Sequence, residues 1–299
     1  MKNLLLFNYN IDIEEVKKIN DDMYSFYIDY IKFYFIKINR PKKDIIYINE
    51  VLSNTFNKFH YMIKNVKGNL ITEFDNKEFV LLKINGPENN EIELIDILND
   101  QFLLGENSFI ELNRTNWGEL WSSKVDYLEY QVSELGQEHM AIRSSFSYYA
   151  GLAENAIQYF NILDVKNAKL SISHRRINYP NYSVNFYNPL NIVEDFRVRD
   201  VAEYLKFAFF NGKSTIDDLT ILINKGIYSD IEYNLLYARL LFPTYYFDMV
   251  SDIFEGKKGD DDLLLYVERA KEYEIFLKEA YENISKRCSL FKVDWLIDK

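Results

Sequence analysis

The chain has 299 residues, of which 48% are hydrophobic and 27% charged, and its formal net charge is −11. This hydrophobic content excludes a disordered chain, and the length is sufficient for two lobes. The acidic balance disfavours a nucleic-acid partner, because proteins that bind the phosphate backbone carry a basic face. A single cysteine, Cys288, excludes internal disulfides and a cysteine-rich zinc site.

The N-terminus resembles a secretion signal only briefly. Its apolar run covers residues 4–7 and is interrupted at once by Asn8 and Asp12. A signal peptide needs an apolar run of about 7–15 residues, and a membrane helix needs about 20. No stretch of the sequence approaches either pattern, so we expect no membrane partner and a cytoplasmic location.

The first ninety residues are predicted to be mostly strands. Residues 24–38 are aromatic and β-branched with partial alternation, which favours two strands. Residues 44–56 carry apolar side chains at helical spacing, and residues 78–84 form the last predicted strand. The Asn-Gly-Pro triplet at 85–87 ends that strand. We therefore expect a small β-rich lobe over residues 1–86.

From residue 87 onward the pattern becomes helical, which predicts a larger lobe over residues 87–299. An apolar stripe over 117–135 starts at a capping-box-like pair, Asn116 and Glu119, and stops at Gly136. Residues 170–196 form an insert of strand-like pieces and turns. The other predicted helices cover 146–160, 198–210, 215–225, 230–255 and 261–285.

The insert contains the segment His174-Arg175-Arg176-Ile-Asn-Tyr-Pro-Asn181. It resembles the H-G-D-x-x-x-x-N catalytic loop of the kinase-like fold of aminoglycoside phosphotransferases and spore-coat kinase-like proteins. His174 and Asn181 match that motif, whereas Arg175 and Arg176 stand at the Gly and catalytic Asp positions. The resemblance touches residues 24–250 and implies an α+β, two-lobed protein-kinase-like fold from a bacterial source.

Two residues of the predicted β-rich lobe resemble nucleotide-binding residues of this family. The Phe-Ile-Lys-Ile segment at 35–38 resembles the strand with the nucleotide-contacting lysine, which implies that role for Lys37. Glu50 lies in the following helix, where the ion-pair partner of that lysine belongs. In the helical lobe, Asp200 resembles the aspartate that opens the next helix, and we expect it to anchor the loop through hydrogen bonds.

The metal-binding aspartate of the family has two candidate positions. Asp195 lies 19 residues after Arg176, which is a usual interval in the family, and it is our preferred assignment. The interval counted back from Asp200 leads instead to Asn188.

These substitutions bear directly on phosphoryl transfer, which relies on positioned carboxylates and on charge neutralisation by Mg²⁺. Arg176 cannot accept a proton, because the pKa of a guanidinium is above ~12. No glycine precedes Gly68, so the first hairpin cannot be a glycine-rich phosphate loop. The resemblance therefore implies a pseudokinase with no required cofactor, which binds a protein partner or a small anionic ligand.

Two alternatives remain open from the sequence. One is an atypical phosphotransferase that uses ATP and Mg²⁺ on a small molecule, with Asp195 on the metal and a substitute base. The other is an unrelated helical interaction protein with a β-rich cap. Because acids are plentiful in this chain, we expect Arg176 to pair internally, with Glu194 or Asp195.

Overall fold

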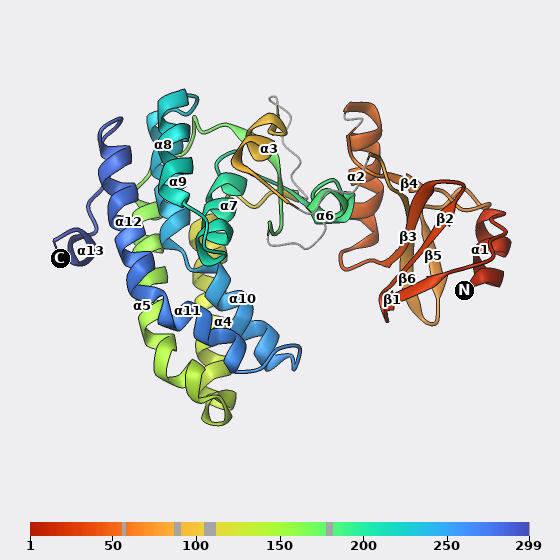
Figure 1. The fold of residues 1–299 in the computed structure, drawn as a ribbon, viewed down its shortest axis with the longest axis horizontal. Helices are drawn as coiled ribbons and strands as arrows, with labels where there is room; N and C mark the ends of the chain where they lie inside the picture. Colours follow the sequence, from red (N-terminus) through yellow and green to blue (C-terminus); the bar gives the residue numbers. More distant parts are fainter. Residues whose placement is uncertain (56–57, 87–90, 105–111, 178–181, 299) are drawn as a thin grey trace. The chain divides into compact units, whose positions relative to one another are not determined.

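The computed structural model describes residues 1–55, 58–86, 91–104, 112–177 and 182–298. The chain forms two compact units (Figure 1). The first unit comprises Met1–Ile92 together with Tyr179–Ile192, and the second comprises Glu93–Asn178 together with Val193–Lys299. Most of the antiparallel strands belong to the first unit, and the long helices belong to the second.

The first unit is built on an antiparallel sheet with the strand order β1-β2-β3-β6-β4, and β5 pairs with β6. The two strands expected within residues 24–38 are present as β2 and β3, joined by a tight turn. The elements of this unit are α1 (Lys2–Tyr9), β1 (Lys17–Asn20), β2 (Met23–Ile28), β3 (Ile31–Lys37), α2 (Lys42–Thr55), β4 (Tyr61–Ile63), β5 (Ile71–Phe74), β6 (Lys77–Lys83) and α6 (Tyr182–Phe186).

Alternation along β3 separates two apolar clusters on opposite faces of this sheet. Tyr34 and Ile36 pack with Ile45 of α2. Phe33 and Phe35 pack with Leu5 of α1 on the other face. The two helices accordingly lie on opposite sides of the sheet (Figure 1). Every side chain of β3 therefore faces either α2 or α1, and its position in the strand decides which.

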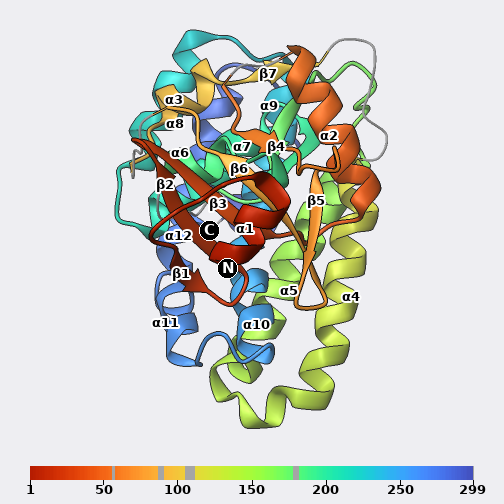
Figure 2. The same cartoon turned by 90° about the vertical axis from the view of Figure 1, so that its right-hand side faces the viewer.

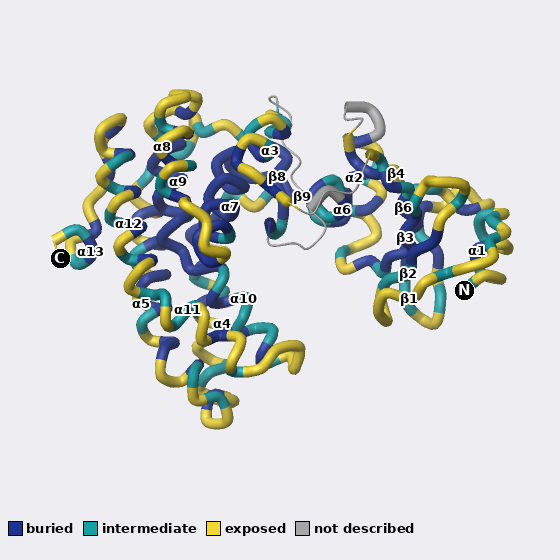
Figure 3. The backbone as a smooth tube through the Cα atoms, viewed as in Figure 1, coloured by how far each residue is buried: buried dark blue, intermediate teal, exposed yellow. Residues whose placement is uncertain are grey.

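The second unit is mostly helical, with a small sheet in the order β7-β8-β9. Helices α4 and α5 run side by side (Figure 2). Helices α7 and α9 are buried along nearly their whole length and form the centre of the unit (Figure 3). The bounds are α3 (Leu94–Asn99), β7 (Phe102–Leu103), α4 (Trp117–Leu135), α5 (Met140–Asn161), β8 (Leu170–His174), β9 (Ile192–Phe196), α7 (Arg199–Phe210), α8 (Thr215–Lys225), α9 (Asp230–Leu241), α10 (Thr244–Phe254), α11 (Asp261–Glu268), α12 (Ala270–Ser285) and α13 (Asp294–Ile297).

Two predicted long helices are each divided in the structure. The helix expected over 230–255 is α9 followed by α10, because Pro243 lies between them and has no N–H group to continue the helical bonding. The helix expected over 261–285 is α11 followed by α12, with the break at Arg269. The guanidinium of Arg269 donates to the carbonyl of Phe209 over 2.7 Å at this break.

The helix termini are closed in different ways. A capping box of Ser229 and Glu232 is formed at the start of α9. At the start of α4, however, Asn116 bonds the side chain of Glu119, and its side chain does not cap the backbone. The stop that we expected at Gly136 is confirmed, since α4 ends at Leu135, but Gly136 has φ −65° and a short 3-10 turn follows in place of a left-handed cap.

The α+β class that the sequence predicts, β-rich toward the N-terminus and helical toward the C-terminus, is confirmed. Among the helices that the structure describes, none combines the length and the hydropathy needed to cross a bilayer.

Candidate functional site

A pair of buried hydrogen bonds fixes the start of the loop that follows β8. The backbone N–H of His174 donates to Oδ1 of Asp200 over 2.9 Å, and Nδ1 of His174 lies 2.7 Å from Oδ2 of the same carboxylate. His174 is the last residue of β8, and Asp200 lies in the first turn of α7. Asp200 thus anchors the loop as expected, and it fixes the position of the residues that follow His174.

Arg176, two residues beyond this anchor, forms an ion pair with Asp248 of α10. Its Nη2 lies 2.5 Å from Oδ1 of Asp248, and its Nε bonds the other carboxylate oxygen. The internal pairing that we expected is therefore present, but the predicted partners were wrong. Asp195 is paired with Arg199, and Glu194 accepts a hydrogen bond from the Asn113 amide over 2.7 Å.

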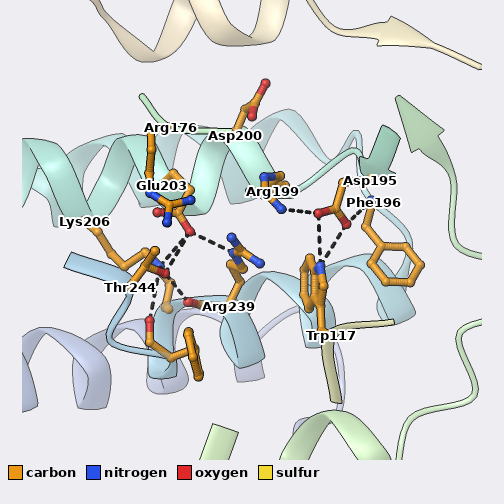
Figure 4. A network of polar contacts seen from close by, with 12 residues as sticks. Trp117, Arg176, Asp195, Phe196, Arg199, Asp200, Glu203, Lys206, Arg239 and Thr244 are labelled. Atoms are coloured by element: carbon orange, nitrogen blue, oxygen red, sulfur yellow. Dashed lines mark hydrogen bonds and ion pairs between the residues drawn. The ribbon is translucent and has the colours of Figure 1, made fainter. Parts of the chain in front are cut away.

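The preferred metal ligand, Asp195, is buried and surrounded by hydrogen-bond donors (Figure 4). Its carboxylate accepts bonds from the indole N–H of Trp117, at 2.8 and 3.1 Å, and from the backbone N–H of Phe196 at 2.7 Å. It also pairs with Arg199. Burial raises the pKa of this carboxyl group, and the positive charges of Arg199 and Arg239 oppose that rise.

Asn188, the other candidate for the metal position, belongs to the first unit. Its buried side-chain oxygen accepts a hydrogen bond from the backbone N–H of Leu190 over 2.9 Å. It therefore caps the short 3-10 turn Pro189–Asn191.

A second buried carboxylate, Glu203 of α7, is the centre of a cation cluster (Figure 4). Its Oε1 lies 2.8 Å from Nζ of Lys206 and 2.8 Å from Nε of Arg239. Burial opposes ionisation of Glu203, but Lys206, Arg239 and Arg199 outweigh it and hold its pKa well below the ordinary value. Burial also lowers the pKa of Lys206 to about 8, against the attraction of Glu203.

Arg239 joins these two buried carboxylate groups. Besides bonding Glu203, its guanidinium lies over the ring of Trp117, 4.9 Å from the ring centre, and 5.6 Å from that of Trp121. The two indole rings stack on each other at 5.1 Å. Cation–π contact and ion pairing thus hold one arginine between Asp195 and Glu203 (Figure 4).

The nucleotide-binding pair that we expected, Lys37 and Glu50, is not formed among the described residues. Lys37 alternates with Ile36, so it lies on the α1 face of the sheet, and its Nζ is 3.3 Å from Asp22. Glu50 is an exposed residue of α2, which packs on the opposite face. The β3 residues that face α2 near the end of the strand are Tyr34 and Ile36.

The turn between β1 and β2 carries two exposed carboxylates, Asp21 and Asp22. Asp21 pairs with Lys18, while Asp22 contacts both Lys77 and Lys37. Hydrogen bonds to Lys18 and to Lys77 lower the pKa values of Asp21 and Asp22, respectively. Both side chains are therefore ionised at neutral pH.

Sequence reasoning missed Asp248, Glu203, Lys206, Arg239 and Trp117 as members of this site. They come from α4, α7, α9 and the start of α10, and no spacing in the sequence connects them. Asn181, the last residue of the motif, lies outside the residues that the structure describes.

Comparisons with known proteins identify the family and the fold of the chain. The chain matches the family described as "Spore coat putative kinase YutH" over residues 2–280. The chain belongs to this family. A relative, the endospore coat-associated protein YutH of Bacillus subtilis (strain 168), is 29% identical over 261 residues, which cover 77% of each chain.

Solved structures show the same fold at low sequence identity. An aminoglycoside phosphotransferase from Alicyclobacillus acidocaldarius superposes with a TM-score of 0.63 at 11% identity, over 93% of this chain and 94% of that one. The AMP-bound spectinomycin phosphotransferase APH(9)-Ia superposes with a TM-score of 0.59 at 13% identity, over 94% of each chain. The protein-kinase-like fold that the sequence predicts is thereby confirmed.

Proposed function

We propose that this member of the kinase-like superfamily is a pseudokinase, which serves as a binding or scaffolding module and does not transfer phosphoryl groups from Mg·ATP. The register of the loop after β8 carries the proposal. His174 is anchored to Asp200, and from the resemblance of this loop to the family motif we assign Arg176 to the position of the catalytic aspartate. A guanidinium cannot accept the proton of a substrate hydroxyl, and its charge repels Mg²⁺.

The surroundings of Asp195 support the same conclusion. A carboxylate that binds Mg²⁺ must turn an oxygen toward the metal and its water molecules. The oxygens of Asp195 instead accept bonds from Trp117 and Arg199. With these bonds in place, Asp195 does not present an oxygen to a magnesium ion.

The sheet does not fit the phosphates of ATP. In protein kinases a glycine-rich loop covers the phosphates, and a lysine of the third strand pairs with a glutamate of the following helix. A residue with that lysine's role must face α2, and the residues that do so here include Tyr34 and Ile36. The first turn carries two carboxylates, Asp21 and Asp22, whose pairs with Lys18, Lys37 and Lys77 occupy the cations near this turn.

The name of the relative adds a cellular role to this proposal. That protein is called endospore coat-associated. We propose that this chain also associates with the spore coat, through a protein partner in the coat. The cytoplasmic location expected from the sequence stays a prediction. A fluorescent fusion in sporulating cells should give a ring around the spore, and a diffuse signal throughout sporulation would contradict coat association.

A turnover assay tests the loss of catalysis. Purified protein is incubated with Mg·ATP and a panel of sugars, aminoglycosides and amino alcohols. We expect no phosphorylated product above the level of the Asp195→Asn variant. Product that forms with the native protein and disappears in Asp195→Asn would establish an atypical phosphotransferase and overturn the proposal.

A further inference from the structure

The helical unit contains a basic cavity beside the loop that follows β8. Its volume is about 310 Å³, at the lower end of the range of small-molecule sites. All the residues that line it belong to this unit. Among them are six cationic side chains and one carboxylate, Asp248; the cations are Arg114, Lys124, Arg175, Arg176, Arg199 and Arg239. This concentration of positive charge contrasts with the net charge of −11 of the chain.

Carboxylates neutralise only part of this charge. Asp195 pairs with Arg199, and Glu203 pairs with Arg239, from positions behind the cavity wall. Asp248 pairs with Arg176 at the cavity itself. The ammonium group of Lys124 is directed to a neutral partner, since it donates to the hydroxyl of Ser251 over 2.7 Å.

Lys124 and Arg176 are neighbours in this wall. Burial lowers the pKa of Lys124, the charge of Arg176 lowers it further, and the charge of Asp248 opposes the shift. Arg114, at the exposed end of the wall, adds another cation. An anion that enters here meets Lys124 and Arg114 without having to displace a carboxylate from either of them in the described structure.

Arg176 is the cation best placed to bind an oxyanion. It grips the carboxylate of Asp248 through Nε and Nη2, which is the two-pronged geometry that guanidinium groups use for carboxylate and phosphate. About 38% of its side chain is exposed. Arg176 and Asp248 also line a second cavity, of about 280 Å³. Nη1 of Arg176 donates to the carbonyl of Arg175, so a ligand oxyanion at Arg176 would share the guanidinium with Asp248 or replace that carboxylate.

Most of the rest of the cavity wall is apolar, since Leu120, Val193 and four aromatic side chains line it. The aromatic side chains are buried and stacked on one another, because Trp121 stacks on Trp117, with ring centres 5.1 Å apart, and on Phe242, with ring centres 4.5 Å apart. The cavity therefore offers apolar edges, and not free ring faces, to the organic part of a ligand.

We propose that this cavity binds a small organic oxyanion, with Arg176 and Lys124 on its charged group and with its apolar part along the apolar wall. The proposal rests on the proposed loss of phosphoryl transfer, because it gives Arg176 a ligand in the place of a catalytic aspartate. The cavity then serves as the ligand site of the binding module.

Calorimetric titration with phenyl phosphate at low ionic strength tests this site, with phenol as the uncharged analogue. We expect saturable binding of phenyl phosphate and none of phenol. Arg176→Gln should weaken binding at least tenfold, and Lys124→Gln should weaken it about threefold or more. Arg143→Gln removes the same charge from an exposed position on α5 outside the cavity, so it should leave the affinity unchanged.

Thermal melting of each variant verifies folding, and Lys124→Gln keeps the test decisive if Arg176→Gln does not fold. Absence of phenyl phosphate binding, or equal loss in Arg143→Gln and both cavity variants, would overturn the site. If binding is absent and the turnover assay is also negative, the inference fails while the pseudokinase proposal stands. Turnover with Mg·ATP would instead refute the pseudokinase proposal, whatever phenyl phosphate does.

Discussion

The two units of this protein arrange their charged side chains differently. In the sheet unit, the turn between β1 and β2 carries Asp21 and Asp22, which pair with Lys18, Lys37 and Lys77. In the helical unit, six cations and one carboxylate, Asp248, line a single cavity, and we propose that Arg176 of this cavity replaces the catalytic aspartate of the family motif. The helical unit thus concentrates positive charge at one cavity, whereas lysines neutralise the exposed acids of the turn in the sheet unit. The comparison teaches that a net charge of −11 says little about the local charge of a site.

The largest effect on stability should follow from removing Glu203, the carboxylate that neutralises the buried cations of the helical unit. Glu203→Ala leaves Lys206 and Arg239 buried without their carboxylate, which costs about 3–5 kcal/mol of folding free energy. The matched control is Glu272→Ala, whose exposed pair with Arg269 contributes about 0–1 kcal/mol. Urea denaturation measures both values, and equal losses would show that the cluster around Glu203 contributes no special stability.

The same residue gives the helical unit an acid dependence. The pKa of Glu203 is lower in the folded state than its reference value of 4.5. Its contribution to stability is therefore complete above pH 4.5 and is lost as the pH falls toward the folded value. The free energy of unfolding of Glu203→Gln, measured from pH 7 to pH 3, should fall less steeply than that of the native protein. Parallel curves would contradict the lowered pKa.

A smaller effect is expected for the pair of Arg176 and Asp248, which is partly exposed. Arg176→Gln and Asp248→Asn should each cost about 1 kcal/mol. In a double-mutant cycle the two losses should be non-additive by about 0.5 kcal/mol or more, because the side chains are in contact. Strict additivity in urea denaturation would mean that the two groups do not interact in solution.

The smallest effect is expected in the sheet unit. Asp22→Asn removes an exposed partner of Lys37 and Lys77, so stability should change by no more than about 0.5 kcal/mol. This variant should also fail to gain affinity for Mg·ATP, because the residues that face α2 near the end of β3, Tyr34 and Ile36, carry no positive charge. Tight nucleotide binding after this one substitution, measured by calorimetry, would show that the charge of Asp22 alone prevents the native protein from binding Mg·ATP.

Helices and strands were predicted well where the apolar pattern was periodic and ended at turn or capping residues. The strands within 24–38 and the helix from Trp117 to Leu135 follow from alternation and from a four-and-three apolar stripe. The division of 230–255 was readable from Pro243, but the apolar pattern runs through that residue without interruption. In such segments a single proline outweighs periodicity.

The site was less predictable, because its contacts join residues far apart in the chain. Arg176 and Asp248 are separated by 72 positions, and Trp117 and Asp195 by 78. The loop anchor was predicted because the motif resemblance identified both His174 and Asp200. The resemblance gave Lys37 a role but no face of the sheet, and a shift of one residue along a strand moves a side chain to the opposite side.

The dependence of ligand binding on Mg²⁺ tests the central claim most directly. Melting temperatures are measured with ATP and with phenyl phosphate, each in excess Mg²⁺ and in EDTA. A ligand that binds only the folded protein stabilises it by about 2.7 kcal/mol at a hundredfold excess over Kd. We expect phenyl phosphate to raise the melting temperature equally with and without the metal, and Mg²⁺ to add nothing to the effect of ATP. Stabilisation by ATP that appears only with Mg²⁺ would show that the protein binds Mg·ATP as a kinase does. That result would contradict the proposed loss of phosphoryl transfer.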